Sequence, residues 1–366
     1  MSNAVKAVKE PLFHIEKRAS LPAWKAWAIR GGALLVALVV SCILSGLFLG
    51  GNPFAFFSSV FSGAFGTSTR INTLLKELSL LLCVSLAVVP AFKMKFWNLG
   101  ANGQILAGCI ATTACMIYLN GVVPPAVLYI LMFVSAILAG AIWAVIPAIF
   151  KAIWNTNESL FTLMMNYIAE GLVAFFLTLW ATDGSGTLNP IKDAMLPKIG
   201  GEDFILPLIV AIVLTAAMYI YMRFTKHGYE ISVVGESENT AKYVGINVKK
   251  VVIRTLIVSG ALCGLVGCLL SGAINGNIST SMHDGMGFTA IMVAWLAKFN
   301  PAIMAVMAFV VIFVERGAAF ASRQMGVTNS AFPSIVTGII FFFVIACEFF
   351  IEYKLKFRSK KKGGNE

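Results

Sequence analysis

The chain has 366 residues, of which 58% are hydrophobic and only 12% are charged. About a quarter of the residues in an ordinary soluble domain are charged, so this composition excludes that class. Many apolar runs approach the ~20 residues that a helix needs to cross a bilayer, which is longer than a strand of a membrane barrel requires. The net charge of +11 does not predict nucleic-acid binding, because the basic residues flank the apolar runs, as in membrane proteins. We therefore predict an all-α polytopic membrane protein.

Apolar runs between polar breaks predict about ten transmembrane helices, some of them short or discontinuous. They occupy a transmembrane domain at residues 31–351, between a basic segment at 1–30 and a basic tail at 352–366. The two runs beside Lys298–Pro301 are short for full crossings, so they either tilt into a hairpin or re-enter from one side. The predicted spans are Gly31–Gly50, Leu78–Phe92, Ile105–Leu119, Ala126–Phe150, Leu160–Trp180, Phe204–Phe224, Val251–Ala273, Gly287–Ala297, Ala302–Val314 and Pro333–Ile351.

The distribution of lysine and arginine predicts the orientation. Basic residues concentrate in both terminal segments and around the loop at residues 225–250, whereas the opposite side holds few of them. By the positive-inside rule, both termini and this loop lie in the cytoplasm. The long connection Ala181–Asp203, which contains Asp183, Gly184 and Gly186, then faces outward.

The segment WNLGANGQ, Trp97–Gln104, places polar residues between long apolar runs. Asn98, Asn102 and Gln104 can hydrogen-bond to whatever lies in the gap, and polar residues at membrane depth are costly enough to indicate a function. These three residues are candidates for a solute path or for its supporting shell. The alternative is a polar turn between two helices.

Three further polar residues recur every fourth position near and within the fifth predicted span: Glu158, Thr162 and Asn166. They lie on one helix face and drift by only about 40° per step, so this stripe should face protein or water rather than lipid. It either lines the solute path or makes hydrogen bonds between helices, since both uses attract Asn and Thr in membranes.

The loop at residues 225–250 contains a short predicted helix, Glu238–Val244. Ser237 is a suitable N-cap, and Gly245 can end the helix in a left-handed conformation. One face offers Ala241, Tyr243 and Val244, whereas the other is charged. Such a helix either docks into a groove on a partner protein or is a solvated connector.

The residues required for an ATP site, a metal site or histidine-based catalysis are missing from the sequence. The sequence contains no G-x-x-x-x-G-K-[ST] phosphate loop, so we expect no ATP site in this chain. The seven cysteines lie in apolar runs and the three histidines are scattered, so we expect neither a metal site nor histidine-based catalysis. An embedded enzyme is therefore disfavoured, because no nucleophile or acid–base pair stands out.

Four segments in order resemble the permease subunits of bacterial ABC importers, in the family that serves branched-chain amino acids, ribose-type sugars and nucleosides. Trp97–Gln104 is similar to the signature F-N-I-G-x-E-G-Q, and Asn157–Ala169 to N-E-x-x-x-T-L-M-L-N-Y-I-A. Gly235–Val248 resembles the coupling loop G-x-N-x-x-A-A-x-Y-x-G-I-N, and Gly287–Pro301 the late segment G-F-x-G-I-A-V-A-L-L-G-x-x-N-P. The second and fourth segments fit the nucleoside and simple-sugar branch best.

This resemblance implies an import permease in the bacterial cell membrane, surrounded by lipid. Its implied partners are a second permease subunit, a cytoplasmic ABC ATPase that binds ATP and Mg²⁺, and an extracytoplasmic solute-binding protein. The implied contacts with the ATPase fall on Glu236, Glu238, Asn239, Ala241, Tyr243 and Gly245. The alternatives are a branched-chain amino acid importer and an ATP-independent secondary transporter, for which Glu158 would be the titrating group.

The chain departs from the family pattern at five positions. Asn102 replaces a glutamate, which puts in doubt any role there that needs a carboxylate. Trp97 replaces phenylalanine and Trp295 replaces leucine, whereas Ala290 and Ala297 replace glycines. The two alanines put in doubt a backbone approach as close as glycine would permit.

Overall fold

The computed structural model describes residues 13–18, 22–49, 53–181, 187–324 and 331–357. The chain forms two compact units, one of Ser62–Arg316 and the other of Met1–Phe61 together with Gly317–Glu366. Asp183, Gly184 and Gly186 of the predicted outward connection lie outside the described residues, as do residues 1–12, 19–21 and 358–366 of the basic terminal segments.

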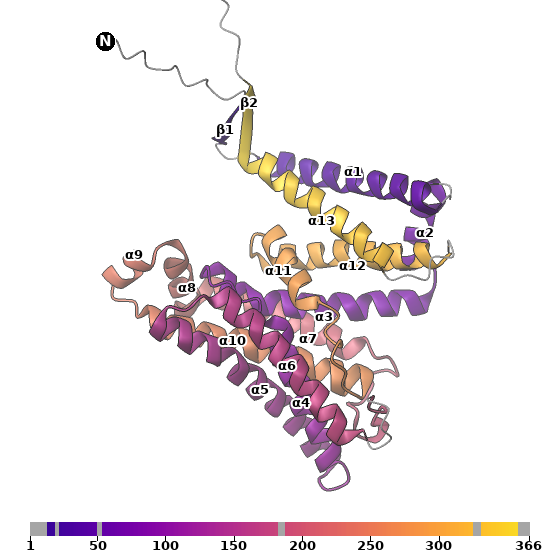
Figure 1. Ribbon diagram of the computed structural model, residues 1–366, viewed down its shortest axis with the longest axis vertical. Helices are drawn as coiled ribbons and strands as arrows, with labels where there is room; N and C mark the ends of the chain where they lie inside the picture. Colours follow the sequence, from indigo (N-terminus) through magenta and orange to yellow (C-terminus); the bar gives the residue numbers. More distant parts are fainter. Residues whose placement is uncertain (1–12, 19–21, 50–52, 182–186, 325–330, 358–366) are drawn as a thin grey trace, which may run out of the picture. The chain divides into compact units, whose positions relative to one another are not determined.

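The larger unit is helical (Figure 1). Side chains cap several of its helices, as Asn157 does by accepting a hydrogen bond from the Leu160 amide at 3.1 Å, which satisfies an otherwise orphaned N–H group. Its complete elements are α3 Ser68–Lys93, α4 Ala101–Leu119, α5 Pro125–Trp154, α6 Glu158–Trp180, the 3₁₀ turn η1 Lys192–Ala194, α7 Ile205–Phe224, α8 Lys226–Glu236, α9 Glu238–Tyr243, α10 Val248–Cys268, the π-helical turn η2 Leu269–Asn275 and α11 Met286–Leu296.

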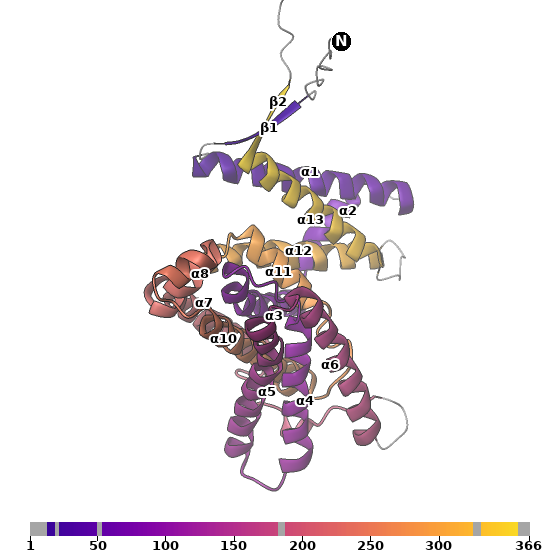
Figure 2. The same ribbon diagram turned by 60° about the vertical axis from the view of Figure 1, so that its left-hand side comes forward.

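Helices α3 and α10 form the core of this unit. Every residue of α3 from Ser79 to Phe92 is buried, as expected for a helix that is apolar on all sides. Helix α10 packs against α3, α4 and α5, and Figure 2 shows α4 and α5 running beside each other. The outer helices expose large apolar side chains, among them Ile142, Phe175 and Ile212. A lipid environment accounts for this pattern better than water does.

The smaller unit joins the two ends of the chain. Helix α1 Ala23–Leu49 packs against α13 Ala331–Glu352. Strand β1 Phe13–Lys17 pairs antiparallel with β2 Tyr353–Phe357, so the segments before α1 and after α13 lie side by side. Two further helices, α2 Pro53–Phe65 and α12 Pro301–Gln324, each contribute residues to both units.

The prediction of an all-α polytopic membrane protein is confirmed. Within the described residues, eight helices are long and apolar enough to cross a membrane, and two shorter apolar helices are Met286–Leu296 and Phe341–Ile351. Together these match the ten predicted runs. Of the pair thought to be short, only α11 is so, because α12 continues to Gln324 and has 24 residues. Helices α2 and α8 were not predicted, since each is short and lacks a long apolar run.

Candidate functional site

The predicted polar segment Trp97–Gln104 (the junction) connects α3 to α4 and is largely buried. Asn98 is fully buried, and its amide oxygen accepts hydrogen bonds from the Gly100 amide at 3.1 Å and from Nε2 of Gln104 at 3.2 Å. Its Nδ2 donates to Oγ of Ser259 on α10 at 3.3 Å. Among the buried polar side-chain atoms of the junction, only Oε1 of Gln104 has no hydrogen-bond partner in the described part of the chain. The junction therefore ties α4 to α10.

Two residues of the predicted stripe on α6 bind the same junction. The Leu99 amide donates to Oγ1 of Thr162 at 3.1 Å. Oδ1 of Asn166 accepts from the Gly103 amide at 2.8 Å, and its Nδ2 donates to the Leu99 carbonyl at 2.9 Å. The structure thus brings the stripe and the junction together, in the arrangement expected if both hold helices to each other.

Two further candidates for the solute path, Asn102 and Glu158, make other contacts. Oδ1 of Asn102 accepts from the Gly287 amide at the start of α11, at 2.8 Å. An amide oxygen fills this acceptor role, so this contact does not require the glutamate of the family pattern. Glu158 points elsewhere and forms an ion pair with Lys151 of α5 at 2.9 Å.

Two of the departures from the family pattern contact each other. The ring centroids of Trp97 and Trp295 lie 5.9 Å apart, within the range of favourable aromatic pairs. Ala290 and Ala297 are both buried, so a β-carbon fits at each position in this chain.

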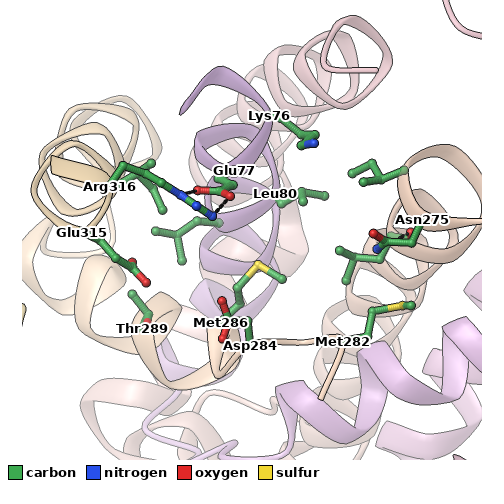
Figure 3. Close-up of a pocket in the computed structure, with 14 residues that line it drawn as sticks. Lys76, Glu77, Leu80, Asn275, Met282, Asp284, Met286, Thr289, Glu315 and Arg316 are labelled. Atoms are coloured by element: carbon green, nitrogen blue, oxygen red, sulfur yellow. Dashed lines mark hydrogen bonds and ion pairs between the residues drawn. The ribbon is translucent and has the colours of Figure 1, made fainter. Parts of the chain in front are cut away.

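A separate cavity of about 220 Å³ lies in the larger unit. Figure 3 shows Glu77 of α3 with Glu315 and Arg316 of α12 on one side, and Asn275 and Met282 across from them. Its polar lining residues are Lys76, Glu77, Asn275, Asp284, Thr289, Glu315 and Arg316, and its apolar lining residues are Leu80, Leu81, Leu270, Ile274, Met282, Met286 and Ile312. None of the six predicted path candidates lines it.

Irregular backbone forms one wall of this cavity. The π-helical turn η2 ends the long helix and contributes Leu270, Ile274 and Asn275 to the lining. Asp284 and Gly285 then follow with φ values of 43° and 67°, a left-handed pair that leads into α11. π-Helical turns and left-handed non-glycine residues occur often at functional sites.

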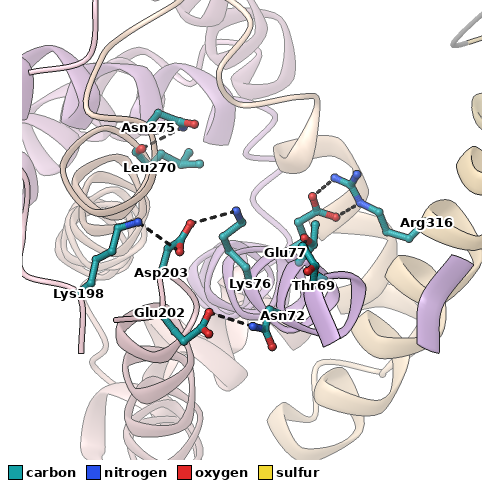
Figure 4. A network of polar contacts seen from close by, with 11 residues as sticks. Thr69, Asn72, Lys76, Glu77, Lys198, Glu202, Asp203, Leu270, Asn275 and Arg316 are labelled. Carbon is teal, nitrogen blue, oxygen red and sulfur yellow. Dashed lines mark hydrogen bonds and ion pairs between the residues drawn. The ribbon is translucent and has the colours of Figure 1, made fainter. Parts of the chain in front are cut away.

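The two cations of the lining each face a carboxylate. The guanidinium of Arg316 pairs with both carboxylate oxygens of Glu77 (Figures 3 and 4). Nζ of Lys76 lies 3.8 Å from Asp203. The lining therefore contains charges of both signs, but its positive charges are largely compensated.

The ion pair of Lys76 extends into a network at the rim (Figure 4). Asp203 also lies 3.5 Å from Nζ of Lys198, and Nδ2 of Asn72 donates to Glu202 at 2.9 Å. These contacts hold the segment before α7 against the beginning of α3.

The sequence patterns did not predict the cavity residues as a site. Only a weak signal was available: Glu77, Glu315 and Arg316 lie directly beside apolar runs, at the ends of the predicted spans Leu78–Phe92 and Ala302–Val314. That signal identifies residues but not their grouping, because Glu77 and Arg316 are separated by more than two hundred positions in the sequence.

At the other ends of α3 and α10, the loop at residues 225–250 folds into α8 and α9. Ser237 caps α9 by accepting from the Thr240 amide at 3.3 Å, and Gly245 has a φ of 82°, so both predicted ends of this helix are confirmed. Glu230 of α8 pairs with Arg254 of α10. A β-carbon on Gly235 would lie 2.1 Å from the Lys93 carbonyl oxygen of α3. Helix α8 is therefore packed closely against both core helices.

Of the three residues predicted for the docking face of α9, Tyr243 and Val244 are exposed, but the prediction is wrong for Ala241, which is not accessible. Tyr243 is 93% exposed, whereas Ala241 is fully buried because it faces the interior of its own chain. The other four residues predicted to contact the ATPase are exposed: Glu236, Glu238, Asn239 and Gly245.

Comparison with known proteins gives one family and several relatives. Residues 70–345 match the family described as "branched-chain amino acid transport system / permease component". A glucose ABC transporter permease of Haloferax volcanii is 28% identical and covers 96% of this chain and 95% of its own. A guanosine ABC transporter permease of Bacillus subtilis is 27% identical over 84% and 90%. A nucleoside ABC transporter permease of Lactococcus lactis is 28% identical over 88% and 92%.

Proposed function

The chain belongs to the permease family of the branched-chain amino acid transport systems, and on this premise we propose that it is the permease subunit of an ABC importer for nucleosides or simple sugars. Similarity to glucose, guanosine and nucleoside permeases along most of each chain supports this solute class. In this proposal the subunit contributes part of the solute path and has no catalytic residues of its own.

The observation that carries the proposal is that the same two helices connect the cavity to α8. On α3, sixteen residues separate Glu77 at the cavity from Lys93 beside α8, or about 24 Å along a helix. On α10 and η2, Leu270 lines the cavity and Arg254 pairs with α8, again about 24 Å apart. Movement of α8 and α9 would thus reach the cavity through packed helices rather than through loops.

In this proposal α9 docks onto a cytoplasmic ABC ATPase, which binds ATP and Mg²⁺ and drives the movement. Tyr243 is the central contact, because an exposed tyrosine on a short rigid helix is typical of residues that dominate binding. A second permease completes the path, and a solute-binding protein delivers the solute from outside. Both termini and the loop at 225–250 then lie in the cytoplasm, as the basic residues indicate.

The substitution Tyr243→Ala tests this coupling in the reconstituted complex. We expect association with the ATPase to weaken about tenfold or more, with a matching loss of ATP-dependent uptake. The free energy of unfolding should change by less than about 0.5 kcal/mol, because the side chain is exposed.

Tyr167→Ala is the matched control, since Tyr167 is an equally bulky exposed tyrosine on α6. It should leave ATPase association unchanged. Normal association of the Tyr243→Ala chain, or uptake that persists without any ATPase, would overturn the proposed function.

A further inference from the structure

The cavity between η2, α11 and the helices that carry Glu77 and Arg316 has the chemistry of a selective site. We propose that it binds the solute directly and selects an uncharged nucleoside, with Asp284 and Glu315 as the acceptors that determine specificity. This inference rests on the proposed function and narrows it, because a permease of this kind need not contain a solute site within one subunit.

The cations of the cavity argue against an anionic solute. Arg316 is engaged by both oxygens of Glu77, and Lys76 faces Asp203. A carboxylate or phosphate would have to displace one of these partners before it gained a cation. Amino acids and nucleotides, which each carry such a group, are therefore poor ligands.

The remaining carboxylates argue for a ligand rich in hydrogen-bond donors. Asp284 and Glu315 line the same cavity. In the described part of the chain, neither side chain makes an ion pair or a hydrogen bond. Carboxyl oxygens accept hydrogen bonds, so these groups suit hydroxyl, amino and ring N–H donors. The ribose and the base of a nucleoside supply such donors without a net charge.

The apolar half of the lining distinguishes a nucleoside from a hexose. Met282, Met286 and Leu270 contribute an apolar part of the lining, which matches the flat face of a base better than the hydroxyl-rich surface of a hexose. Methionine adapts to the shape of flat rings and makes favourable contacts between sulfur and aromatic groups. The volume of about 220 Å³ lies below the ~300–1,000 Å³ typical of drug-sized ligands, which favours a small solute. The base of a nucleoside would pack against the apolar part of the lining, and its ribose would form hydrogen bonds with the carboxylates.

Direct binding to the complete transporter, in lipid nanodiscs without ATP or binding protein, tests this inference. Radiolabelled guanosine should bind at least tenfold more tightly than glucose, leucine or guanosine monophosphate. Glu315→Gln and Asp284→Asn should each weaken guanosine binding about tenfold, because each removes a charge-assisted hydrogen bond. Asparagine also tolerates the left-handed backbone at position 284. Asp193→Asn is the control, since Asp193 is an exposed carboxylate that does not line the cavity.

A second measurement does not depend on these carboxylates. A cysteine introduced by Thr289→Cys should react with a charged thiol reagent, and guanosine should slow that reaction at least fivefold, whereas glucose should not. The chain without this substitution gives the background labelling from its seven native cysteines.

Two results would overturn the inference while leaving the proposed function intact. In the first, glucose or leucine binds more tightly than guanosine, although uptake remains dependent on ATP. In the second, the carboxylate variants bind guanosine normally and guanosine gives no protection at position 289. Failure of the proposed function has a different signature, which is guanosine binding without ATPase association or ATP-dependent uptake.

Discussion

The junction and the cavity both place polar groups among apolar helices, but the groups face different surroundings. At the junction, Asn98 and Asn166 are buried and their amides bind the backbone or side chains of neighbouring helices. In the cavity, Asp284 and Glu315 line open space. Asn98 and Asn166 therefore hold neighbouring segments together, whereas Asp284 and Glu315 do not. A buried polar side chain in a membrane protein can therefore either join helices or line a cavity, and the atoms that it contacts show which role it has.

The same contrast bears on the two polar patterns that the sequence singled out as candidates for the solute path. Residues 97–104 and the stripe on α6 stood out as candidates for the path because they are polar at membrane depth. Their hydrogen bonds now favour the alternative of helix packing. The role of a path lining stays a prediction for them, whereas the cavity gives the stronger geometric candidate.

The largest expected effect comes from Asn166→Leu at the junction. Leucine would leave the Gly103 amide and the Leu99 carbonyl without the partners they have in this chain. Each orphaned group costs ~1–3 kcal/mol, so we expect the two together to lower the free energy of unfolding by roughly 2–6 kcal/mol. Denaturant unfolding in detergent, together with the amount of folded protein recovered from membranes, measures this loss.

Asn120→Leu is the matched control, because Asn120 is exposed at the end of α4. It should be close to neutral. If Asn166→Leu instead kept full stability and abolished uptake, the junction would belong to the solute path and the contrast with the cavity would disappear.

An intermediate effect is expected at the cavity wall, where Glu77→Gln separates Arg316 from its carboxylate. The two side chains are 20% and 36% exposed, so water offsets part of the lost interaction and we expect a cost of about 1–2 kcal/mol. The double substitution Glu77→Gln with Arg316→Gln should cost less than the sum of the two single ones. A double-mutant cycle of unfolding free energies measures that difference, and strict additivity would show that the pair does not stabilise the cavity wall.

The smallest effect is expected for Glu315→Gln, which changes a carboxylate that makes no ion pair or hydrogen bond with the described residues. Its free energy of unfolding should stay within about 0.5 kcal/mol of the parent chain. The same denaturant unfolding measures it. A loss as large as that of Asn166→Leu would mean that the cavity residues also serve mainly to hold helices together.

Much of the fold could be predicted because the apolar runs are long. Each of the ten runs corresponds to a helix, and the ends of α9 followed from Ser237 and Gly245, whose roles are local. Helices α2 and α8 could not be predicted in this way, since short helices depend on packing more than on their own sequence. The close fit of Gly235 on Lys93 is such a packing contact.

The site was harder to predict because its meaning depends on contacts between distant residues. The spacing of Thr162 and Asn166 correctly indicated a common helix face, but it could not say what the face meets. Ala241 has the same difficulty: its position on an amphipathic helix suggested docking, whereas it is fully buried within its own chain.

The sequence by itself determined the membrane class, the long apolar helices and the family, because these depend on composition, apolar run length and local motifs. Only the tertiary structure decided which polar groups are satisfied and which face open space. Helices α3 and α12, the turn η2 and the loop before α11 bring Glu77, Asn275, Asp284, Glu315 and Arg316 around one cavity. A hydrogen bond requires two groups at a defined distance and angle, and a linear sequence does not contain that information.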